Sequence, residues 1–457
     1  MDIFHALLMS VKPNKQTVFS YEIDTTKDSS HTTQTILPFP ESGYFYPDET
    51  FVDWGDNTTT TYPALSSTGF NRTHDYSVGG VYTITITCNA GMMPYFSAYN
   101  MGYSTYGQQI TKILTPFMKM VECSYTGVIS DYLGNIGDGS TTGQDAYKGT
   151  FYNMANLSLI PDKLFKYCPN FIGFHSTFNG CVLLQNIPND LFKYIVPPIV
   201  NYNNFPGTTI SLQACFYNCS SLLTIPTNLI RNKCINSFGS MFGGCSSLTS
   251  IPSDIFVNCE FSVGANDFRG GFLFNACTEI VTVGKVFNNC TAKNYDEDLR
   301  NISIERMFYT CVKLETLDKD LLRGQWVNYV NNVSNLCRGC PLLSGNTDGF
   351  LQDIFKDSDV SSLDSSYVFY GCNKLQLSAN IFYENGITDR FSGASSVNFD
   401  YFIYRTSFTG TQGTAPDLWN QTGITSVSSS STFAGSGNSL TSLTNYADIP
   451  TAWGGNA

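Results

Sequence analysis

The sequence is poor in charge. Only 14% of its 457 residues are Asp, Glu, Lys or Arg, and 25 Lys and Arg stand against 37 Asp and Glu. No run of basic residues occurs along the chain. Because nucleic-acid binding depends on clustered Lys and Arg that displace counterions from phosphates, we expect no nucleic-acid partner.

Long apolar runs are also missing. A membrane-spanning helix needs roughly 20 consecutive apolar residues, whereas the apolar stretches here are only a few residues long. Residues 1–9 carry an acid where a secretory signal has Lys or Arg, and they lack a small-residue cleavage site. We therefore expect no membrane insertion and no export by the usual route.

Histidine is scarce, and no catalytic motif is recognisable. The histidines are scattered at His5, His31, His74 and His175, whereas nucleophilic catalysis needs a nucleophile, a base and an orienting group together. The sequence predicts a protein that is not an enzyme and uses no cofactor or catalytic metal. A glycosidase stays open as a third alternative, since its two carboxylates can come from distant parts of a chain.

The first hundred residues alternate in the manner of β-strands. Residues 17–24 alternate apolar and polar side chains, and residues 81–87 alternate β-branched ones. Between them lie the extended segments 35–39 and 51–57, and a Gly-Asp-Asn turn reverses the second into residues 58–62. Several short strands joined by turns predict a β-sandwich.

Three motifs in this region carry a family resemblance. They are Val52-Asp53-Trp54-Gly55-Asp56, then His74-Asp75-Tyr76, then Gly79-Gly80-Val81-Tyr82-Thr83-Ile84-Thr85-Ile86. In this order they resemble the polycystin-type (PKD-like) immunoglobulin-like domain, with mild departures at Asn57 and Asp75. The resemblance covers residues 17–90 and implies a spacer or adhesion module.

Downstream, the sequence repeats itself, and the repeat is its strongest signal. Most units begin Phe-x-x-Cys, with Leu or Ile three residues after the Cys. Aligned in this way, the first unit begins at Phe151, the ninth at Phe408 and the tenth at Phe433, while Cys337 replaces Phe in the seventh. The residues expected to form structural ladders are Phe178, Cys181, Phe216, Cys219, Phe242, Cys245, Phe274, Cys277, Phe308, Cys311, Cys340, Phe369 and Cys372.

The spacing within a unit predicts how units pack. Phe, Cys and Leu at i, i+3 and i+6 lie on one side of a helical turn that opens into a short extended segment. A unit with a single apolar edge cannot fold alone, so stacked units must share burial, with Phe on Phe and Cys on Cys. A second Phe-x-x-Cys at Phe165, Phe256 and Phe287 is expected to pack a second turn. Most of the 15 cysteines are therefore expected to be reduced thiols, and their positions favour packing over disulfide bridges.

These repeats resemble the BspA-like leucine-rich repeats of bacterial surface proteins and some bacteriophage proteins. The match spans about residues 148–446 and implies a curved solenoid that presents a binding surface. A PKD-like module before such repeats looks like surface-exposed proteins of gut Bacteroidales and their phages. We expect a mainly β fold with short helical turns, divided into an N-terminal docking segment (1–16), an immunoglobulin-like β-sandwich (17–95), a linker and solenoid cap (96–147), a leucine-rich-repeat solenoid (148–446) and a tail (447–457).

Several residue groups could be metal or redox sites, and a structural role is favoured for each. His175 lies near Cys168 and Cys181, and Cys337 with Cys340 forms a lone CxxC, but the cysteines fall at repeat positions. Asp53, Asp56 and His74 are expected to hydrogen-bond turn backbone. The acidic clusters 296–298 and 357–359 could hold Ca²⁺, but they follow no known calcium-loop pattern and are interpreted as solvated loops.

Two groups of residues are candidates for binding. A helical apolar stripe could dock onto a virion or another subunit, or pack on the sandwich itself, and consists of Ile3, Phe4, Leu7, Leu8 and Val11. The two longest units carry aromatic insertions at 194–209 and 385–406. These predict receptor contacts, unless the rings pack back onto the solenoid, at Tyr194, Tyr202, Phe205, Tyr401, Phe402 and Tyr404.

The leading hypothesis is a non-enzymatic bacteriophage virion protein, a head fibre or tail-associated decoration, assembled in the bacterial cytoplasm. It would attach to capsid or tail proteins through its N-terminal region and project the solenoid towards a host or mucosal glycan or protein. The missing signal sequence favours it over the alternative, a bacterial cell-surface adhesin. We expect a homo-oligomer, a dimer or trimer, because closed symmetry multiplies weak contacts.

Overall fold

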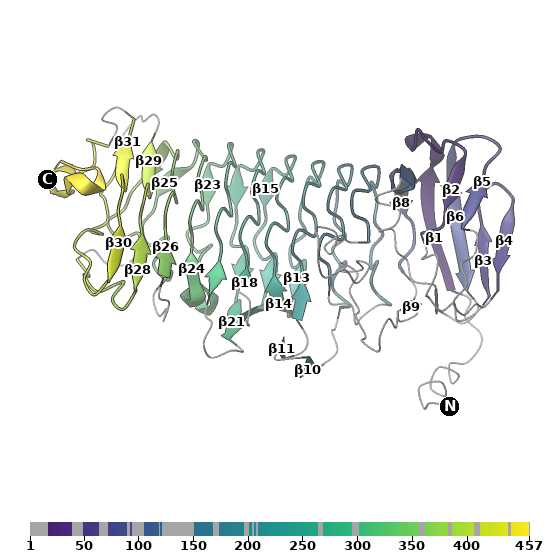
Figure 1. Cartoon of the computed structure of the whole chain (residues 1–457), viewed down its shortest axis with the longest axis horizontal. Coiled ribbons are helices and arrows are strands. Elements are labelled where there is room, and N and C mark those ends of the chain that lie inside the picture. The colour runs from purple at the N-terminus through teal and green to yellow at the C-terminus, as the bar shows by residue number, and fades with distance from the viewer. Residues whose placement is uncertain are drawn as a thin grey trace.

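In the computed structural model, the chain forms an elongated rod with an antiparallel sheet region at its N-terminal end and a parallel β-solenoid along the rest (Figure 1). The structure describes residues 17–38, 49–63, 72–88, 92–93, 105–117, 119–120, 150–167, 173–195, 201–202, 205–206, 209–263, 268–294, 301–355, 362–382, 386–405, 412–436 and 440–456. Regular secondary structure in these residues consists of β-strands and short 3-10 turns. The predicted mainly β fold is confirmed.

Five strands form the N-terminal antiparallel sheet. In the order β4-β3-β6-β1-β8, they are Thr59–Tyr62, Thr50–Asp53, Val81–Cys88, Thr17–Asp24 and Ile110–Ile113. β1 pairs with β6 over its whole length, from Thr17 opposite Cys88 to Asp24 opposite Val81. A second sheet pairs β2 (Gln34–Ile36) with β5 (Thr73–Asp75). The alternation at 17–24 and 81–87 thus correctly predicted strands β1 and β6 of the five-stranded sheet. The predicted turn into residues 58–62 is also present, between β3 and β4.

β8 joins the sheet region to the solenoid. It pairs antiparallel with β1, placing Tyr21 opposite Ile113, and the Ile113 backbone N–H donates to the oxygen of Leu159 at 2.9 Å. The Phe117 ring then stacks on Phe19 at a centroid distance of 5.2 Å and on Phe151 at 5.9 Å. The two regions thus share one hydrophobic core. β8 lies in the segment that the sequence assigned to a linker and cap, yet it is the edge strand of the sheet.

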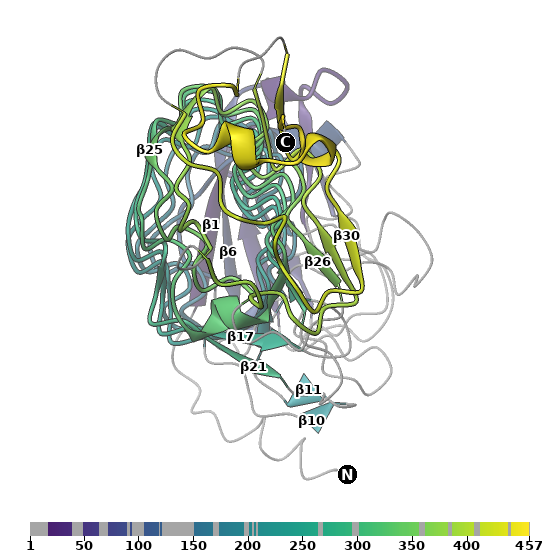
Figure 2. The same ribbon diagram turned by 90° about the vertical axis from the view of Figure 1, so that its left-hand side faces the viewer.

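Parallel strands of successive coils build the walls of the solenoid, and in a view along the rod the coils lie over one another (Figure 2). The largest sheet contains β12 (Thr209–Ser211), β14 (Cys234–Ser237), β17 (Glu260–Val263), β18 (Phe268–Arg269), β21 (Thr291–Asn294), β22 (Ile302–Ser303), β24 (Val330–Asn332), β26 (Ser362–Asp364), β28 (Ser396–Asn398) and β30 (Ser426–Ser428). A second wall contains β13 (Ile230–Arg231), β16 (Phe256–Val257) and β20 (Phe287–Asn288), and a third contains β15 (Ser250–Ile251), β19 (Thr282–Val283) and β23 (Thr316–Leu317).

Shorter elements complete the fold. The remaining strand pairs are β25 (Ser344–Asn346) with β27 (Lys374–Gln376), β29 (Ile403–Arg405) with β31 (Phe433–Gly435), β7 (Met92–Met93) with β9 (Lys119–Met120), and β10 (Asn201–Tyr202) with β11 (Phe205–Pro206). The 3-10 turns are η1 (Thr25–Lys27), η2 (Thr105–Gln109), η4 (Gln325–Tyr329), η5 (Tyr446–Asp448) and η6 (Thr451–Trp453). In the view of Figure 1 the coils stack along a nearly straight axis, without the expected curvature.

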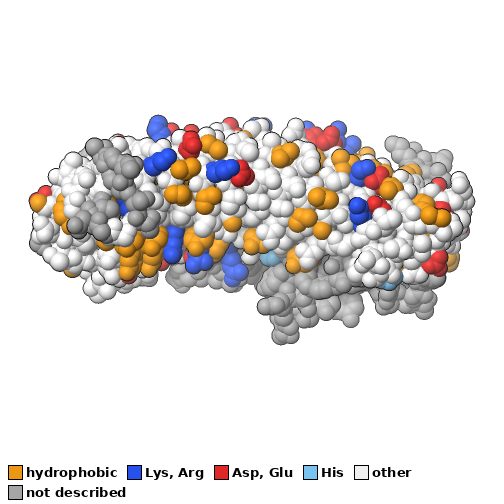
Figure 3. All heavy atoms as spheres, turned by 90° about the horizontal axis from the view of Figure 1, so that it is seen from above, with side chains coloured by type: hydrophobic (Ala, Val, Ile, Leu, Met, Phe, Trp, Pro, Cys, Tyr) orange, Lys and Arg blue, Asp and Glu red, His pale blue; other side chains and the backbone are white. Residues whose placement is uncertain are grey.

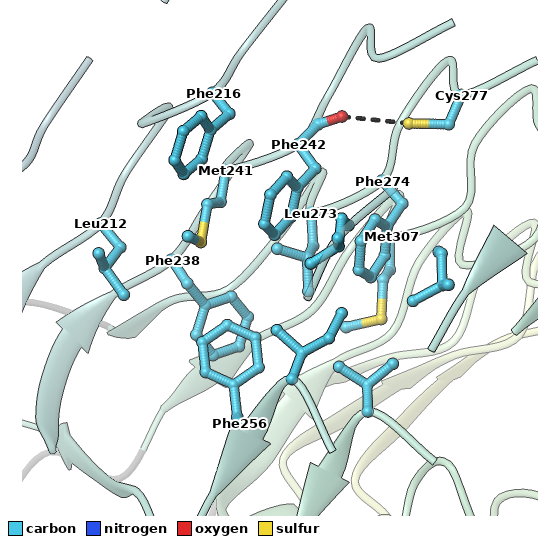
Figure 4. Packing of buried hydrophobic residues seen from close by; sticks show 14 of the residues in the cluster. Leu212, Phe216, Phe238, Met241, Phe242, Phe256, Leu273, Phe274, Cys277 and Met307 are labelled. Atoms are coloured by element: carbon cyan, nitrogen blue, oxygen red, sulfur yellow. Dashed lines mark hydrogen bonds between the residues drawn. The ribbon is translucent and has the colours of Figure 1, made fainter. Parts of the chain in front are cut away.

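The repeat phenylalanines form the predicted ladder inside the solenoid (Figure 4). Consecutive rings from Phe151 to Phe308 lie 5.1 to 5.8 Å apart, with planes within 10° of parallel. Within a unit, the backbone N–H of Cys245 donates to the oxygen of Phe242 and that of Leu248 to the oxygen of Cys245. Each Phe-Cys-Leu motif is thus a pair of tight turns that directs three side chains into the core.

Two details of the repeat alignment were wrong. The ninth unit places Ile403 on the ladder, because Ile403 pairs with the ladder residue Phe433 in adjacent strands β29 and β31, while Phe408 lies outside the described residues. Because this unit has Ile where most others have Phe, the sequence alignment started the unit at Phe408 and not at Ile403. The second Phe-x-x-Cys differs from the prediction at two of its three occurrences: Phe165 lies in a turn, but Phe256 and Phe287 lie in the paired strands β16 and β20, and their rings stack at 5.4 Å.

Candidate functional site

The polar residues of the N-terminal motifs build turns. Asp53 Oδ1 accepts a hydrogen bond from the backbone N–H of Gly55 at 2.9 Å, and Asp56 Oδ1 accepts one from Thr58 at 3.0 Å. His74 Nε2 lies 2.9 Å from Asp56 Oδ2, and its ring stacks on Trp54. Burial alone would raise the pKa of Asp56, but hydrogen bonds from Thr58 and His74 outweigh it and hold the pKa below its usual value. Asp53 and Asp56 thus bond turn backbone as expected, whereas His74 bonds the Asp56 side chain and not the backbone.

The ladder thiols are donors to the backbone. Each donates to the carbonyl oxygen of the ladder residue in the preceding coil, in the pairs Cys181–Phe151, Cys219–Phe178, Cys245–Phe216, Cys277–Phe242, Cys311–Phe274, Cys340–Phe308 and Cys372–Cys337. Burial raises the pKa of Cys245, Cys311 and Cys372 to about 12. Because only the thiolate is a good nucleophile and metal ligand, these thiols are structural.

The described cysteines of the two candidate metal or redox sites, Cys181, Cys337 and Cys340, are also buried. Cys337 occupies the ladder Phe position, Cys340 the ladder Cys position, and burial raises the pKa of both. Burial, together with the charge of Arg269, lowers the pKa of His175 to about 4, so its imidazole is neutral at physiological pH. Cys168, the other cysteine near His175, lies outside the described residues.

Within the described ranges, no group of three or more His, Cys, Asp or Glu side chains is placed to hold a metal ion. The acidic clusters 296–298 and 357–359 lie outside those ranges. The part of the chain that the structure describes also contains no helix that is long and apolar enough to cross a membrane.

The predicted binding residues have different positions in the structure. Phe402 is completely buried in the core, so its assignment as a receptor contact was wrong. Tyr401 and Tyr404, on either side, are half-buried at the surface, and so is Tyr194. Described residues 386–405 form a regular coil with β28 and β29, not a protruding loop.

Two further sets of predicted residues can be placed only in part. Tyr202 and Phe205 face each other across the β10–β11 pair, and nothing is described of their side chains. The docking stripe lies outside the described residues; it consists of Ile3, Phe4, Leu7, Leu8 and Val11.

Tyr401 and Tyr404 belong to two surface columns that the sequence analysis missed. The columns hold the residues two before and one after the ladder position of each coil, and backbone hydrogen bonds between coils keep them in register. From the fifth to the ninth of these coils, the two columns hold aromatic residues and arginine at every position except Asn275 and Asn335. We call these side chains the aromatic ridge: Phe272, Arg306, Tyr309, Arg338, Tyr367, Tyr370, Tyr401 and Tyr404.

The side chains of the aromatic ridge stack on one another along the rod. Tyr367 stacks on Tyr401 and Tyr370 on Tyr404, both with a centroid distance of 4.9 Å. The Arg338 guanidinium lies 4.8 Å from the ring centroids of Tyr367 and Tyr370 and 5.9 Å from that of Tyr309. Arg306 lies over Phe272 at 5.1 Å. Collecting the residues at these two offsets from each ladder residue gives the ridge, but Tyr401 and Tyr404 are found in this way only when Ile403, and not Phe408, is taken as the ladder residue.

No family model matches the chain, and no curated protein matches it.

Proposed function

We propose that this chain is a non-enzymatic adhesion protein of a bacteriophage virion, a head fibre or tail-associated decoration that attaches through its N-terminal region and projects its solenoid outwards. One observation carries the proposal: Phe117 packs on both Phe19 and Phe151, so a single core connects the sheet region to the solenoid. A protein that must hold a binding surface at a distance needs such a rigid connection. The interior ladders supply stiffness, and the surface columns are free to vary.

The sequence resemblances support the same function. The Asp53-Trp54-Gly55-Asp56 and His74-Asp75-Tyr76 motifs resemble PKD-like modules, and the Phe-x-x-Cys repeats resemble BspA-like repeats, both of which imply adhesion or spacing. The buried ladder thiols and the engagement of Asp56 and His74 in a turn are consistent with a role without catalysis. Assembly as a dimer or trimer would multiply weak contacts to a host surface.

The test is mass spectrometry of gradient-purified phage particles from the source culture, compared with the washed cell envelope. We expect stoichiometric recovery of this chain in the particles. Recovery only in the envelope would contradict a virion role and favour the alternative, a bacterial cell-surface adhesin of the BspA-like type. That alternative uses the same rigid rod and differs in what anchors it.

A further inference from the structure

We propose that the aromatic ridge is a binding site for a polysaccharide that carries carboxylate or sulfate groups. The proposal deepens the adhesion role above, and rests on it, by naming the class of receptor. On the face drawn in Figure 3, hydrophobic side chains lie beside Lys and Arg side chains along one edge, towards the C-terminal end of the solenoid. The ridge extends over five coils, a length of about 19 Å at the usual spacing of about 4.8 Å between paired strands.

The backbone conformation indicates that the fold does not require large side chains in the column two residues before the ladder position. Phe272, Arg306, Tyr367 and Tyr401 all have positive φ, between 52° and 61°, a region that disfavours bulky residues. The same column position in other coils also has positive φ and holds small residues, such as Ser176, Ala214, Ser240 and Ser431. The solenoid therefore accepts Ser or Ala at this position. Strained residues that the fold does not require are typical of functional sites.

The ridge presents unused hydrogen-bond donors to solvent. The hydroxyl groups of its five tyrosines have no hydrogen-bond partner among the described residues, and none of the five is fully buried. Arg338 uses one N–H to donate to Asn335 Oδ1 at 3.0 Å, while Arg306 is exposed. A guanidinium stacked on rings keeps its N–H edge outward, in a fork that fits an oxyanion. The ridge is thus a row of donors suited to a partner rich in acceptors.

The charge of the ridge favours an acidic partner. Neither Arg306 nor Arg338 forms an ion pair within the part of the chain that the structure describes. The carboxylates close in sequence to the ridge have other partners: Glu305 accepts from Asn332, Asp364 from the Ser366 backbone, and Asp400 from Ser428 and Ser430. With two cations in a chain of net charge −12, the ridge suits a polymer with spaced anionic groups better than densely charged nucleic acid. Beyond about 8 Å, physiological salt screens the remaining negative charge.

Small residues bound the ridge at both ends. The coil after Tyr401 and Tyr404 places Ser431 and Ala434 in the two columns, and the coil before Phe272 places Ser240 and Gly243 there. The Tyr217 ring packs over Gly243, and Gly454 lies beside Ala434, so the chain itself covers these two positions and the ridge is bounded at both ends. Aromatic faces bind apolar C–H surfaces, and the adjoining hydroxyl and guanidinium groups bind polar substituents.

The experiment measures binding of the full chain to immobilised polygalacturonate, hyaluronan and chondroitin sulfate, with dextran and fully methyl-esterified polygalacturonate as uncharged probes. We expect binding to at least one acidic polymer that weakens as salt is raised, and at least tenfold weaker binding to the uncharged probes. The variants R338Q, Y370A with Y404A, and Y370F with Y404F should each weaken binding. The Phe variants keep the stack and remove only the hydroxyl groups, so they test the site if the Ala variants fail to fold.

Matched controls come from the same molecule. Tyr217 occupies the same column in an earlier coil outside the ridge, and Arg231 is an exposed arginine on β13, so Y217A and R231Q should leave binding unchanged. The proposal is overturned if none of the acidic polymers binds, if polygalacturonate and its methyl ester bind equally, or if the control variants weaken binding as much as the ridge variants. Equal or tighter binding of poly-glutamate would also overturn it and indicate an acidic protein partner. Recovery in phage particles does not depend on the ridge, so the two proposals can fail separately.

Discussion

The Cys277 thiol donates a hydrogen bond to the backbone oxygen of Phe242 in the preceding coil, at an Sγ to oxygen distance of 3.1 Å (Figure 4). The same oxygen also accepts from the backbone N–H of Cys245. The thiol therefore supplements the tight turn that begins at Phe242 and connects it to the next coil. This connection recurs from the coil of Phe151 to the coil of Phe369, so a sulfur donor holds each of these coils to the next one.

Replacing one ladder thiol should weaken this connection measurably. We expect C277A to lower the free energy of unfolding by about 1 to 2 kcal/mol, because it removes a buried sulfur and one of two donors to Phe242. Urea denaturation gives the value. C234A is the control, since Cys234 is only half-buried and lies outside the ladder. An equal effect of both substitutions would contradict the ladder role.

Thiol reactivity should separate the buried ladder cysteines from Cys234, which is half-buried. Native protein treated with iodoacetamide at pH 8 should be modified at Cys234 well before Cys245, Cys311 or Cys372. Burial shields those three side chains and raises their pKa to about 12, so the thiolate is nearly absent. Peptide mass spectrometry over a time course measures the order. Early modification of the ladder cysteines would show that the coils open readily.

The junction at Phe117 should stabilise both regions at once. F117A should cost about 3 to 5 kcal/mol, as expected for a buried aromatic ring replaced by Ala. Hydrogen exchange should then increase both in β1 and in residues 151–160, because Phe117 packs on Phe19 and on Phe151. F274A, in the middle of the ladder, is the control and should leave exchange in β1 unchanged. Faster exchange on only one side of the junction would argue against a shared core.

His175 should make stability depend on pH in a defined window. Its pKa is lowered from 6.5 to about 4 in the fold, so between these values the unfolded chain binds a proton that the folded chain does not. Stability is therefore lost as pH falls from about 6.5 to 4, and we expect about 2 kcal/mol between pH 7 and pH 5. Urea denaturation at both pH values, for the natural chain and for H175Q, isolates this contribution. The prediction fails if both proteins lose the same amount.

The sequence predicted those parts of the fold in which apolar side chains recur at a fixed spacing, because that spacing places them all on the buried side. Residues 17–24 and the Phe-x-x-Cys units each repeat a pattern that a strand or a stacked turn imposes; the strand was predicted correctly, and so was the ladder from Phe178 to Cys372, but not the ninth unit. β8 was missed because its four residues have no alternation and their partner, β1, lies far away in sequence. Only the tertiary fold makes such a short segment a strand.

The candidate site was harder to predict because neighbouring aromatic residues have opposite environments. Tyr401, Phe402 and Tyr404 look alike in sequence, yet only Phe402 points into the core. The register of the coil decides this, and Ile403 at a ladder position concealed that register. Once the ladder is aligned correctly, the ridge positions follow by counting from each ladder residue.

The shared core has a consequence for distance. In a solenoid built on a rigid base, each coil adds a fixed rise of about 4.8 Å, so the position of a residue in the sequence translates into its height above the base. Gaining or losing one repeat would move every later side chain by one such step without altering its surroundings. The number of coils therefore sets the length of the rod. Natural variants with more or fewer repeats would hold the same surface side chains at a different distance from the N-terminal sheet region.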